Sequence, residues 1–365
     1  MKYGWNELSH LVQTEGRVHV DPHDNCMYFD WTCTGFRCTF VGTVLSAKIR
    51  GIENNFMGQI EWPVIGILNE KGEMKRITVQ NGDFDYTLAE FDENTAHTVD
   101  VVKLSEGMRG QCGLLSLETD GEIVPAKEEK ASLHIELVGD SITCGYGNEE
   151  KDPAKHFDPK TENGYISYGA LAARELGARA RWISVSGIST AVDHSRPMPF
   201  EMQGMEELYP YVDLPLEKKL GKTEFTLYDF KKDPVDAVVL NLGTNDVNMV
   251  KMAKPEKKEE ALVFFRTHYR GMIEMIRKYN PEAMIFCCLG PLDYFLYDEI
   301  RDIVDEYKAK SGDDRIVRFK FGPVLQWSEG YGADMHPSAA THERMGHELA
   351  AMIRRYVCKE DGGVK

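Results

Sequence analysis

The segment from Leu137 to Ile142 constrains this chain most, because an apolar strand ends there abruptly in Gly139, Asp140 and Ser141. A strand that ends in such a turn delivers one hydroxyl to the rim of a sheet, where a nucleophilic serine has to stand. A serine hydroxyl is nearly inert at neutral pH, so it needs a base within hydrogen-bonding distance. It also needs donors for the oxygen that becomes negative on attack. The rest of the chain has to supply both.

The part of the chain that begins at this strand alternates between strand-like and helix-like segments. Its strand candidates are residues 133–138, 181–185, 237–242, 284–289 and 316–321. Alternation of this kind predicts a mostly parallel sheet covered by helices on both faces. Apolar residues spaced by three and four from Leu262 to Ile276 predict a helix whose aromatic side chains are core. The last helix is expected to open with Pro337 at its first helical position.

The N-terminal third has a different pattern. Short strands follow one another from about residue 17 to 118, separated by turn residues at the spacing of a β-sandwich. Four of the separate strands are predicted at residues 36–41, 44–49, 86–91 and 97–104. A length of 365 residues suggests two domains. We expect an all-β sandwich over residues 1–125, a charged linker over 126–132 and an α/β domain over 133–365.

Two segments downstream carry candidate partners for the serine. Asn245 follows the apolar strand that ends at Leu242, and Gly243 lets the chain turn sharply between them. His336 is a candidate base on a loop ahead of the last helix. Alone, an asparagine after a strand is a turn residue, and a histidine before a proline means little. Together with Ser141 they predict nucleophilic catalysis.

These segments resemble the four blocks of the SGNH/GDSL hydrolase superfamily, in the same order along residues 133–357. The matching residues are Gly139-Asp140-Ser141, Ser186-Gly187, Gly243-Thr244-Asn245-Asp246 and Asp334-Met335-His336-Pro337. The resemblance implies a flavodoxin-like three-layer α/β/α domain. It also implies that Ser141 is the nucleophile and His336 the base. The oxyanion hole is then made by the backbone amides of Ser141 and Gly187 and the Asn245 side chain.

One position departs from the commonest pattern of the superfamily. The supporting acid usually stands three residues before the histidine, whereas residue 333 is alanine and the acid is Asp334, two residues before His336. Either Asp334 orients the imidazole and completes a catalytic triad, or a backbone carbonyl does so and leaves a Ser-His dyad. We take the triad as the prediction and keep the dyad as the alternative.

A sandwich placed before such a domain, together with the shortened Asp-x-His-Pro block, resembles carbohydrate esterase family two, the acetyl xylan esterase type with an N-terminal jelly-roll. The resemblance implies a serine esterase that removes acetyl groups from plant polysaccharides through an acetyl-serine intermediate. Trp327, nine residues before the histidine, is a candidate to stack on a sugar ring, with packing as the alternative.

Two other functions stay open. One is a lipid or thioester hydrolase of the same superfamily, although the insert at residues 192–233 is rich in charge and proline rather than apolar like a lid. The other is a non-catalytic carbohydrate-binding protein, against which the intact set of Ser141, Asn245 and His336 argues.

The composition and net charge limit the classes of molecule that this chain is expected to bind. The net charge is −16, from 43 basic and 59 acidic side chains, which disfavours nucleic acid and anionic membranes. An acetylated oligosaccharide or polysaccharide, being neutral, fits better. The eight cysteines form no C-x-x-C pair, so we expect reduced thiols. We expect no metal, because His342 and His347 are five residues apart rather than four and Pro22 between His19 and His23 favours a surface turn. No cofactor is expected. The first residues lack the apolar core of a secretory signal, which predicts a cytoplasmic protein, or a secreted one if a leader was removed. A homo-oligomer stays open.

Overall fold

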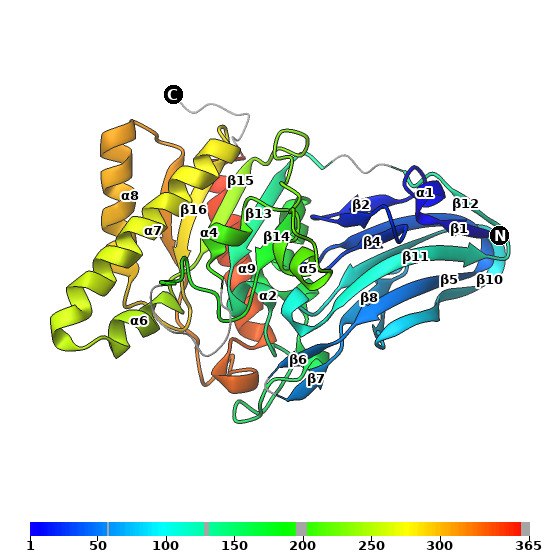
Figure 1. Cartoon of the computed structure of the whole chain (residues 1–365), viewed down its shortest axis with the longest axis horizontal. Coiled ribbons are helices and arrows are strands. Elements are labelled where there is room, and N and C mark those ends of the chain that lie inside the picture. The colour runs from blue at the N-terminus through cyan, green and yellow to red at the C-terminus, as the bar shows by residue number, and fades with distance from the viewer. Residues whose placement is uncertain (57, 128–130, 195–202, 359–365) are drawn as a thin grey trace. The chain divides into compact units, whose positions relative to one another are not determined.

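We describe a computed structural model of the chain, for residues 1–56, 58–127, 131–194 and 203–358. The chain forms two compact units (Figure 1). The β unit contains residues 1–130, 157–165 and 212–226, and the α/β unit contains residues 131–156, 166–211 and 227–365. Each is described by itself. In the described part of the chain, no helix is both long and apolar enough to cross a membrane.

The α/β unit is built on a five-stranded parallel sheet in the order β14-β13-β15-β16-β17. Its strands are β13 (His134–Gly139), β14 (Arg179–Ser184), β15 (Ala237–Asn241), β16 (Met284–Leu289) and β17 (Ile316–Lys320). Every residue of β15 and β16 is buried, including Cys287 and Cys288. A strand buried on both faces is a continuous apolar run. The sequence predicted all five strands to within two residues at either end.

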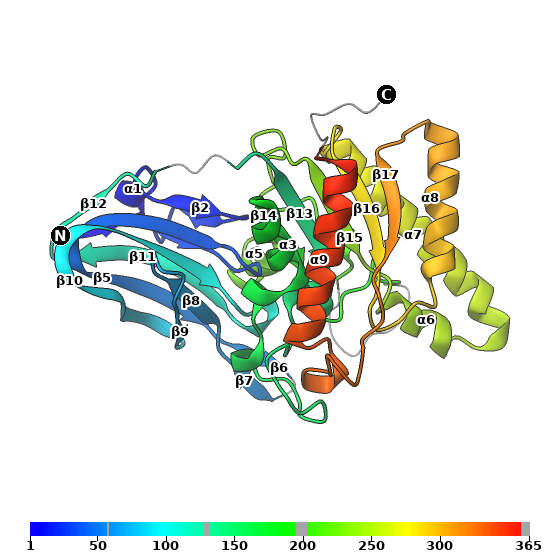
Figure 2. The same cartoon turned by 180° about the vertical axis from the view of Figure 1, so that it is seen from behind.

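Helices cover both faces of this sheet. Figures 1 and 2 show α7 (Lys258–Tyr279) over one face and α3 (Tyr168–Leu176) with α9 (Ala339–Tyr356) over the other. The predicted stripe of α7 is core, since Phe265, Tyr269 and Ile276 are buried. The remaining α-helices of the unit are α2 (Ser141–Cys144), α4 (Met205–Leu208), α6 (Asp246–Met252) and α8 (Tyr297–Ser311). The three-layer α/β/α fold is therefore confirmed.

The strand order creates one natural place for a site. After β13 the chain adds β14 on one side and later β15 on the other. The carboxyl ends of these strands align, with Gly139 opposite both Ser184 and Asn241. Ligands of open α/β sheets bind where the strand order reverses in this way. The loops that follow β13, β14 and β15 meet there.

The start of the last helix differs from the prediction. Helix α9 begins at Ala339, and Ser338 caps it by accepting a hydrogen bond from the Thr341 amide at 3.3 Å. Pro337 lies before this cap, where it pairs with Tyr331 in an isolated β-bridge. The prediction of Pro337 at the first helical position was wrong because a serine hydroxyl satisfies a free amide of the first turn, and the helix starts after it.

The β unit is a curled antiparallel sheet of ten strands around an apolar core that includes Phe29, Phe36 and Phe40. Its path is β3-β4-β11-β5-β10-β8-β9, with β1 on β11 and with β2 and β12 on β5. The strands are β1 (Lys2–Gly4), β2 (Gln13–Glu15), β3 (His19–Asp21), β4 (Cys26–Tyr28), β5 (Gly35–Ile52), β8 (Val64–Leu68), β9 (Met74–Thr78), β10 (Gly82–Lys103), β11 (Gln111–Thr119) and β12 (Glu122–Val124). A separate hairpin pairs β6 (Asn54–Phe56) with β7 (Gln59–Glu61), and two short helices are α1 (Trp5–Leu8) and α5 (Leu214–Lys219). Across both units, short 3₁₀ turns lie at Gly107–Arg109, Pro159–Thr161, Gly164–Ile166, Pro255–Lys257 and Ala333–Met335.

The prediction of four short strands in the middle of this unit was wrong. Residues 36–41 and 44–49 belong to the single strand β5, and residues 86–91 and 97–104 belong to β10, except for Leu104. The two strands pair along most of their length, with shifts of register near Leu88 and between Glu90 and Thr95. Bulges let a strand bend without a turn, so the polar residues that suggested strand ends lie within bent strands.

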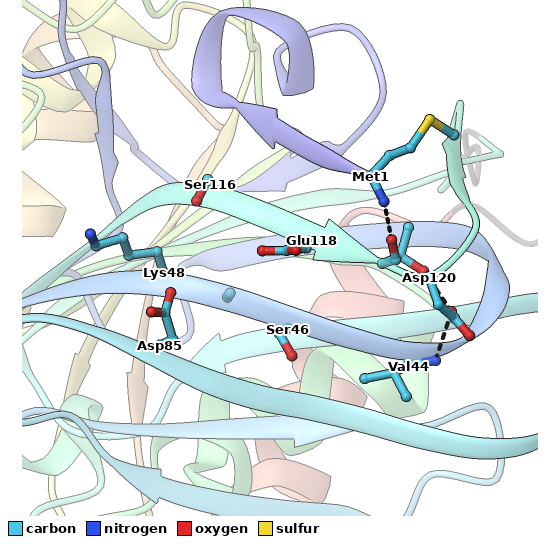
Figure 3. A pocket seen from close by; sticks show the side chains of 10 residues that line it. Met1, Val44, Ser46, Lys48, Asp85, Ser116, Glu118 and Asp120 are labelled. Atoms are coloured by element: carbon cyan, nitrogen blue, oxygen red, sulfur yellow. Dashed lines mark hydrogen bonds between the residues drawn. The ribbon is translucent and has the colours of Figure 1, made fainter.

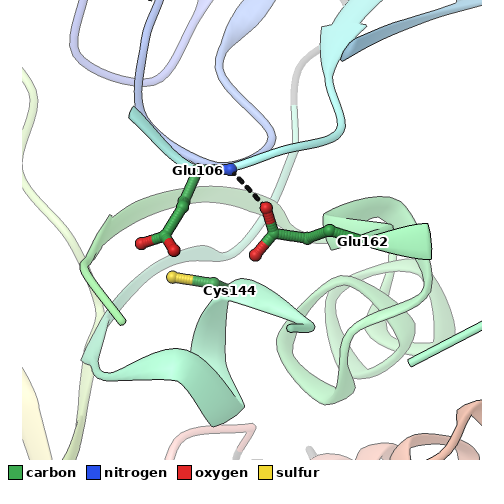
Figure 4. A group of neighbouring side chains, drawn as sticks. All are labelled: Glu106, Cys144 and Glu162. Carbon is green, nitrogen blue, oxygen red and sulfur yellow. Dashed lines mark hydrogen bonds between the residues drawn. The ribbon is translucent and has the colours of Figure 1, made fainter. Parts of the chain in front are cut away.

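Two segments that follow the first strand of the α/β unit in the sequence complete the β unit, residues 157–165 and 212–226. Glu162 accepts a hydrogen bond from the Glu106 amide at 2.8 Å (Figure 4), and the Gly164 amide donates to Leu104 O at 2.9 Å. The Trp31 indole donates to Val212 O at 2.8 Å. The predicted boundary at residues 126–132 stays a prediction, and residues 128–130 lie outside the described residues.

A buried ion pair joins the two first strands of the α/β unit. Arg181 on β14 donates to Glu136 on β13 at 2.5 Å and to Asp233 Oδ2 at 2.8 Å. The Tyr209 hydroxyl donates to the other oxygen of Glu136 at 2.5 Å. Arg181 and Glu136 are both buried. Losing one partner of such a pair leaves an uncompensated charge in the core.

We therefore expect Arg181→Leu to lower the free energy of unfolding by about 3–5 kcal/mol. Arg301→Leu, which removes an exposed arginine paired with Asp298 and Asp302, is the control and should change stability little. Urea unfolding followed by tryptophan fluorescence measures both. Equal losses in the two variants would contradict the assignment of stability to the buried pair.

Candidate active site

Ser141 stands directly after β13, at the first position of the short helix α2. Asp140 caps this helix, because its carboxylate accepts a hydrogen bond from the Ile142 amide at 3.0 Å. The strand-end turn is tight, since a Cβ on Gly139 would lie 2.0 Å from Thr143 Oγ1. The sequence therefore holds the Ser141 hydroxyl at the carboxyl edge of the sheet, as predicted.

His336 reaches Ser141 from the opposite end of the domain sequence. Its Nε2 lies 3.0 Å from Ser141 Oγ, although the two residues are 195 positions apart. This distance is a hydrogen bond between a hydroxyl and a ring nitrogen able to take its proton. The structure thus brings the predicted nucleophile and base together.

Asp334 lies beside His336 and contacts its ring through the backbone. His336 Nδ1 is 3.3 Å from Asp334 O, and the Asp334 carboxylate accepts hydrogen bonds from Tyr146 OH and His156 Nδ1, each at 2.9 Å. Asp334 and Met335 both have positive φ, 49° and 61°, a conformation that non-glycine residues adopt rarely. Of the two arrangements left open by the sequence, these contacts favour the backbone carbonyl as the partner of Nδ1.

The predicted oxyanion donors come from three loops at the same edge. Gly187 is exposed with φ of 80°, and a Cβ there would meet no atom within 4 Å. The Asn245 side-chain amide donates to Ile188 O at 3.0 Å and lies 3.4 Å from Asp140 Oδ2. The second contact is long for a hydrogen bond, so the hydrogen directed toward Asp140 is the one that a substrate oxygen can take. One N–H therefore fixes Asn245, and the other agrees with its predicted role as an oxyanion donor.

Two buried carboxyls support this edge. Asp246 accepts a hydrogen bond from the Thr190 amide at 2.9 Å, which ties the loop after β14 to the start of α6. Burial raises the pKa of Asp246 to about 6 and that of Asp140 to about 7. A carboxyl in a dry environment resists ionisation because its charged form loses hydration.

Trp327 is 98% exposed, so the packing interpretation was wrong and stacking on a sugar stays a prediction. A hollow of about 760 Å³ lies between residues 148–153, which follow α2, and residues 326–331, which precede His336. Its lining includes the polar side chains of Glu150, Gln326 and Tyr331 among apolar surface. Such a surface offers hydrogen-bonding groups next to the catalytic loops.

The β unit has a hollow of its own, about 510 Å³, on the face of β5, β10 and β11 (Figure 3). Lys48 and Asp85, which are cross-strand partners, and Ser116 line it. The lining includes serine hydroxyls, carboxylates and Lys48, but no histidine.

Sequence reasoning missed Tyr146 and His156. Tyr146 stacks on the His336 ring, with centroids 4.1 Å apart, and both missed residues hydrogen-bond to Asp334. Neither residue lies at the end of a strand or in one of the four sequence blocks of the SGNH/GDSL superfamily. The only available signal was that Tyr146 lies five residues after the nucleophile.

Replacing Asn245 tests the oxyanion hole. Asn245→Ala is expected to lower kcat by about 10²–10³ with KM little changed, because the donor acts on charge that develops in the transition state. Asn248→Ala, on the exposed face of the same helix, is the matched control and should keep wild-type kcat. Steady-state hydrolysis of an aryl acetate measures both. A loss below tenfold in Asn245→Ala would remove it from the oxyanion hole.

The buried Asp140 carboxyl makes stability depend on pH. Its pKa is about 7 in the folded protein against an ordinary value of 3.8, so the folded state holds a proton that the unfolded state has released between these values. Its contribution to stability is full below about pH 4 and is lost as pH rises through about 7. Asp140→Asn should therefore reduce the fall in unfolding free energy between about pH 4.5 and pH 7, by about 1.4 kcal/mol per pKa unit. Parallel pH dependences in urea unfolding would refute this.

Comparisons with known proteins agree with this geometry. The GDSL-like Lipase/Acylhydrolase family model matches residues 137–344, and the Carbohydrate esterase 2 N-terminal model matches residues 14–126. Cellulase/esterase CelE of Acetivibrio thermocellus is 32% identical over 331 residues, which are 89% of this chain and 37% of that protein. The chain thus spans well under half the length of this relative. An acetylxylan esterase / glucomannan deacetylase of Cellvibrio japonicus is 26% identical over 350 residues, 93% of this chain and 89% of that one.

Solved structures give the same result over both units. A family two carbohydrate esterase from Clostridium thermocellum, in complex with cellohexaose, has a TM-score of 0.79 and 28% identity, covering 94% of this chain and 98% of that one. An acetyl xylan esterase, Est2A, from the rumen bacterium Butyrivibrio proteoclasticus has a TM-score of 0.83 at 20% identity, covering 97% and 98%, and this likeness shows the fold. The resemblance inferred from the sequence is confirmed: the chain belongs to the GDSL-like lipase/acylhydrolase family and carries the N-terminal domain of carbohydrate esterase family 2.

Proposed function

We propose that the chain is a carbohydrate O-acetylesterase that works through an acetyl-serine intermediate. The observation that carries this proposal is the 3.0 Å contact between His336 Nε2 and Ser141 Oγ at the carboxyl edge of the sheet. Membership of a family of ester hydrolases supports the reaction class. The N-terminal match to carbohydrate esterases supports the substrate class.

The geometry supports a two-step reaction. Ser141 Oγ attacks the acetyl carbonyl carbon while His336 Nε2 takes the hydroxyl proton. The amides of Ser141 and Gly187 and the side chain of Asn245 receive the negative oxygen. The bond to the sugar oxygen then breaks, and His336 returns the proton to that oxygen. Water, deprotonated by His336, attacks the acetyl-serine, and collapse releases acetate and restores Ser141.

The tautomer of His336 follows from its partners. A backbone carbonyl only accepts hydrogen bonds, so at 3.3 Å from Asp334 O the Nδ1 atom carries the hydrogen. Nε2 is then left without a proton and can act as the base toward Ser141. We therefore propose a Ser-His pair whose ring is held by the Asp334 carbonyl, in preference to the triad.

An acetylated plant polysaccharide or oligosaccharide is the proposed substrate. A chain with a net charge of −16 does not attract anionic ligands, and acetylated glycans are uncharged. Relatives named for acetylxylan and glucomannan, and one solved with cellohexaose, support the same class. The exposed Trp327 ring is proposed as a stacking surface for the glycan, since a tryptophan face offers a large rigid contact area.

A preference for short acyl groups over long ones would distinguish this function from that of a lipid or thioester hydrolase. Part of the insert that would form a lid, residues 195–202, lies outside the described residues. A carbohydrate-binding protein without activity is disfavoured by the hydrogen-bonded pair of Ser141 and His336.

Ser141→Ala should abolish hydrolysis while leaving the fold intact, since the hydroxyl contributes little packing. Ser328→Ala, an exposed serine before the histidine, is the control with wild-type activity. For the wild type, turnover should fall from aryl acetate to butyrate to octanoate, and acetate should be released from acetylated xylo-oligosaccharides or mannans. Near wild-type turnover in Ser141→Ala rejects the mechanism, and faster hydrolysis of octanoate than of acetate moves the assignment to lipid esters.

A further inference from the structure

Tyr146 lies flat against the base of the proposed reaction. Its ring centroid is 4.1 Å from that of His336, and the two planes meet at 29° (stacked). Its hydroxyl donates to Asp334 Oδ2 at 2.9 Å, and the other oxygen of this carboxylate accepts from His156 Nδ1 at 2.9 Å. The ring is thus held at one end by a carboxylate while its face covers the imidazole.

The backbone fixes both partners of this stack. The Tyr146 amide donates to Ser141 O at 3.1 Å, so the ring is tied to the nucleophile's own turn. On the other side, the Asp334 amide donates to Lys155 O at 3.0 Å and the Ala333 amide to Gly147 O at 3.0 Å. The loop that follows Tyr146 and the loop that holds His336 are therefore one hydrogen-bonded assembly.

This arrangement can stabilise the positive charge that His336 gains during the proposed reaction. His336 becomes an imidazolium when it takes the Ser141 proton, and the face of an aromatic ring attracts a cation. A phenol that donates its hydrogen to a carboxylate gains electron density on its ring, which strengthens this attraction. The Asp334 carboxylate can therefore influence His336 through Tyr146 as well as by its own charge.

We propose that Tyr146 is a positioning residue that holds the His336 imidazole and stabilises its protonated form, and that Asp334 acts on His336 mainly by anchoring the Tyr146 hydroxyl. The inference rests on the proposed esterase function for its kinetic test. It gives Asp334 a role that neither the triad nor the bare dyad contains.

Other groups able to carry charge surround this site. Asp140 precedes the nucleophile, His156 contacts Asp334, and His342 on α9 interacts electrostatically with His336. Burial lowers the pKa of His342 to about 3, so it is neutral across the working range. All variants keep these three groups. Asp334→Asn removes the carboxylate partner of His156, so the NMR titration has to resolve His156 separately from His336.

The test compares wild type, Tyr146→Leu, Tyr146→Phe, Asp334→Asn and the double variant Tyr146→Phe/Asp334→Asn. Asparagine suits position 334 because it tolerates positive φ. Tyr279→Leu, which removes a ring stacked on Phe230 in the same unit, is the packing control. The readouts are kcat and KM for an aryl acetate, the pH dependence of kcat/KM, and the His336 titration followed by NMR of labelled histidine.

Tyr146→Leu should lower kcat about 2- to 30-fold, with KM within about twofold, and should move the acid limb and the His336 titration to lower pH. Tyr146→Phe should stay close to the wild type in both pH readouts, because the ring remains. Asp334→Asn should cost about tenfold or less in kcat, and clearly less again in the Tyr146→Phe background. The Tyr279→Leu control should move neither pH readout.

Two results would overturn the proposal. A Tyr146→Leu variant with unchanged kcat and an unchanged His336 titration would make the stack ordinary packing. An equal loss from Asp334→Asn in both backgrounds would show that its charge acts directly on His336. If the wild type hydrolyses no ester, the proposed function fails, and the NMR titration still decides the role of Tyr146.

Discussion

The active site depends on a close approach of two backbone segments, the loop after α2 and the loop before α9. The Ala333 amide bonds to Gly147 O at 3.0 Å, and the Ala339 amide bonds to Asn148 O at 2.8 Å. A Cβ on Gly147 would lie 2.4 Å from the Cβ of Ala333, and the residue has φ of 52°, so only glycine allows this contact. Ser141 and His336, distant in sequence, meet because these loops are bonded to each other.

The electrostatics of the site follow from burial. Asp140 and Asp246 lie next to Ser141 and Asn245 in the sequence, and both would be fully charged near neutral pH in water. Burial raises the pKa of both carboxyls, to about 7 and about 6. Less negative charge therefore stands beside the proposed oxyanion site, while the two side chains still accept the hydrogen bonds that shape the turns.

The sequence predicted correctly those features that depend on the local pattern of a single helix, strand or turn. Strands β15 and β16 are largely apolar and fully buried, and the predicted Ser141, Asn245 and His336 stand at the ends of elements, so local pattern and family resemblance pointed to them. The roles of Asp334 and Tyr146 depend instead on contacts across nearly 190 residues, which no local pattern contains. The length of β5 and β10 was missed for a related reason, since bulges continue a strand through polar residues that otherwise mark a turn.

The β unit is not continuous in the sequence, and this has a consequence for how the protein is made. The indole of Trp31 finds its acceptor at Val212, and the Glu106 amide finds its acceptor at Glu162. All ten strands of the sheet are translated before either acceptor. The β unit therefore completes its hydrogen bonding only after part of the α/β unit has been translated. A fragment that stops at the charged linker would lack both segments permanently.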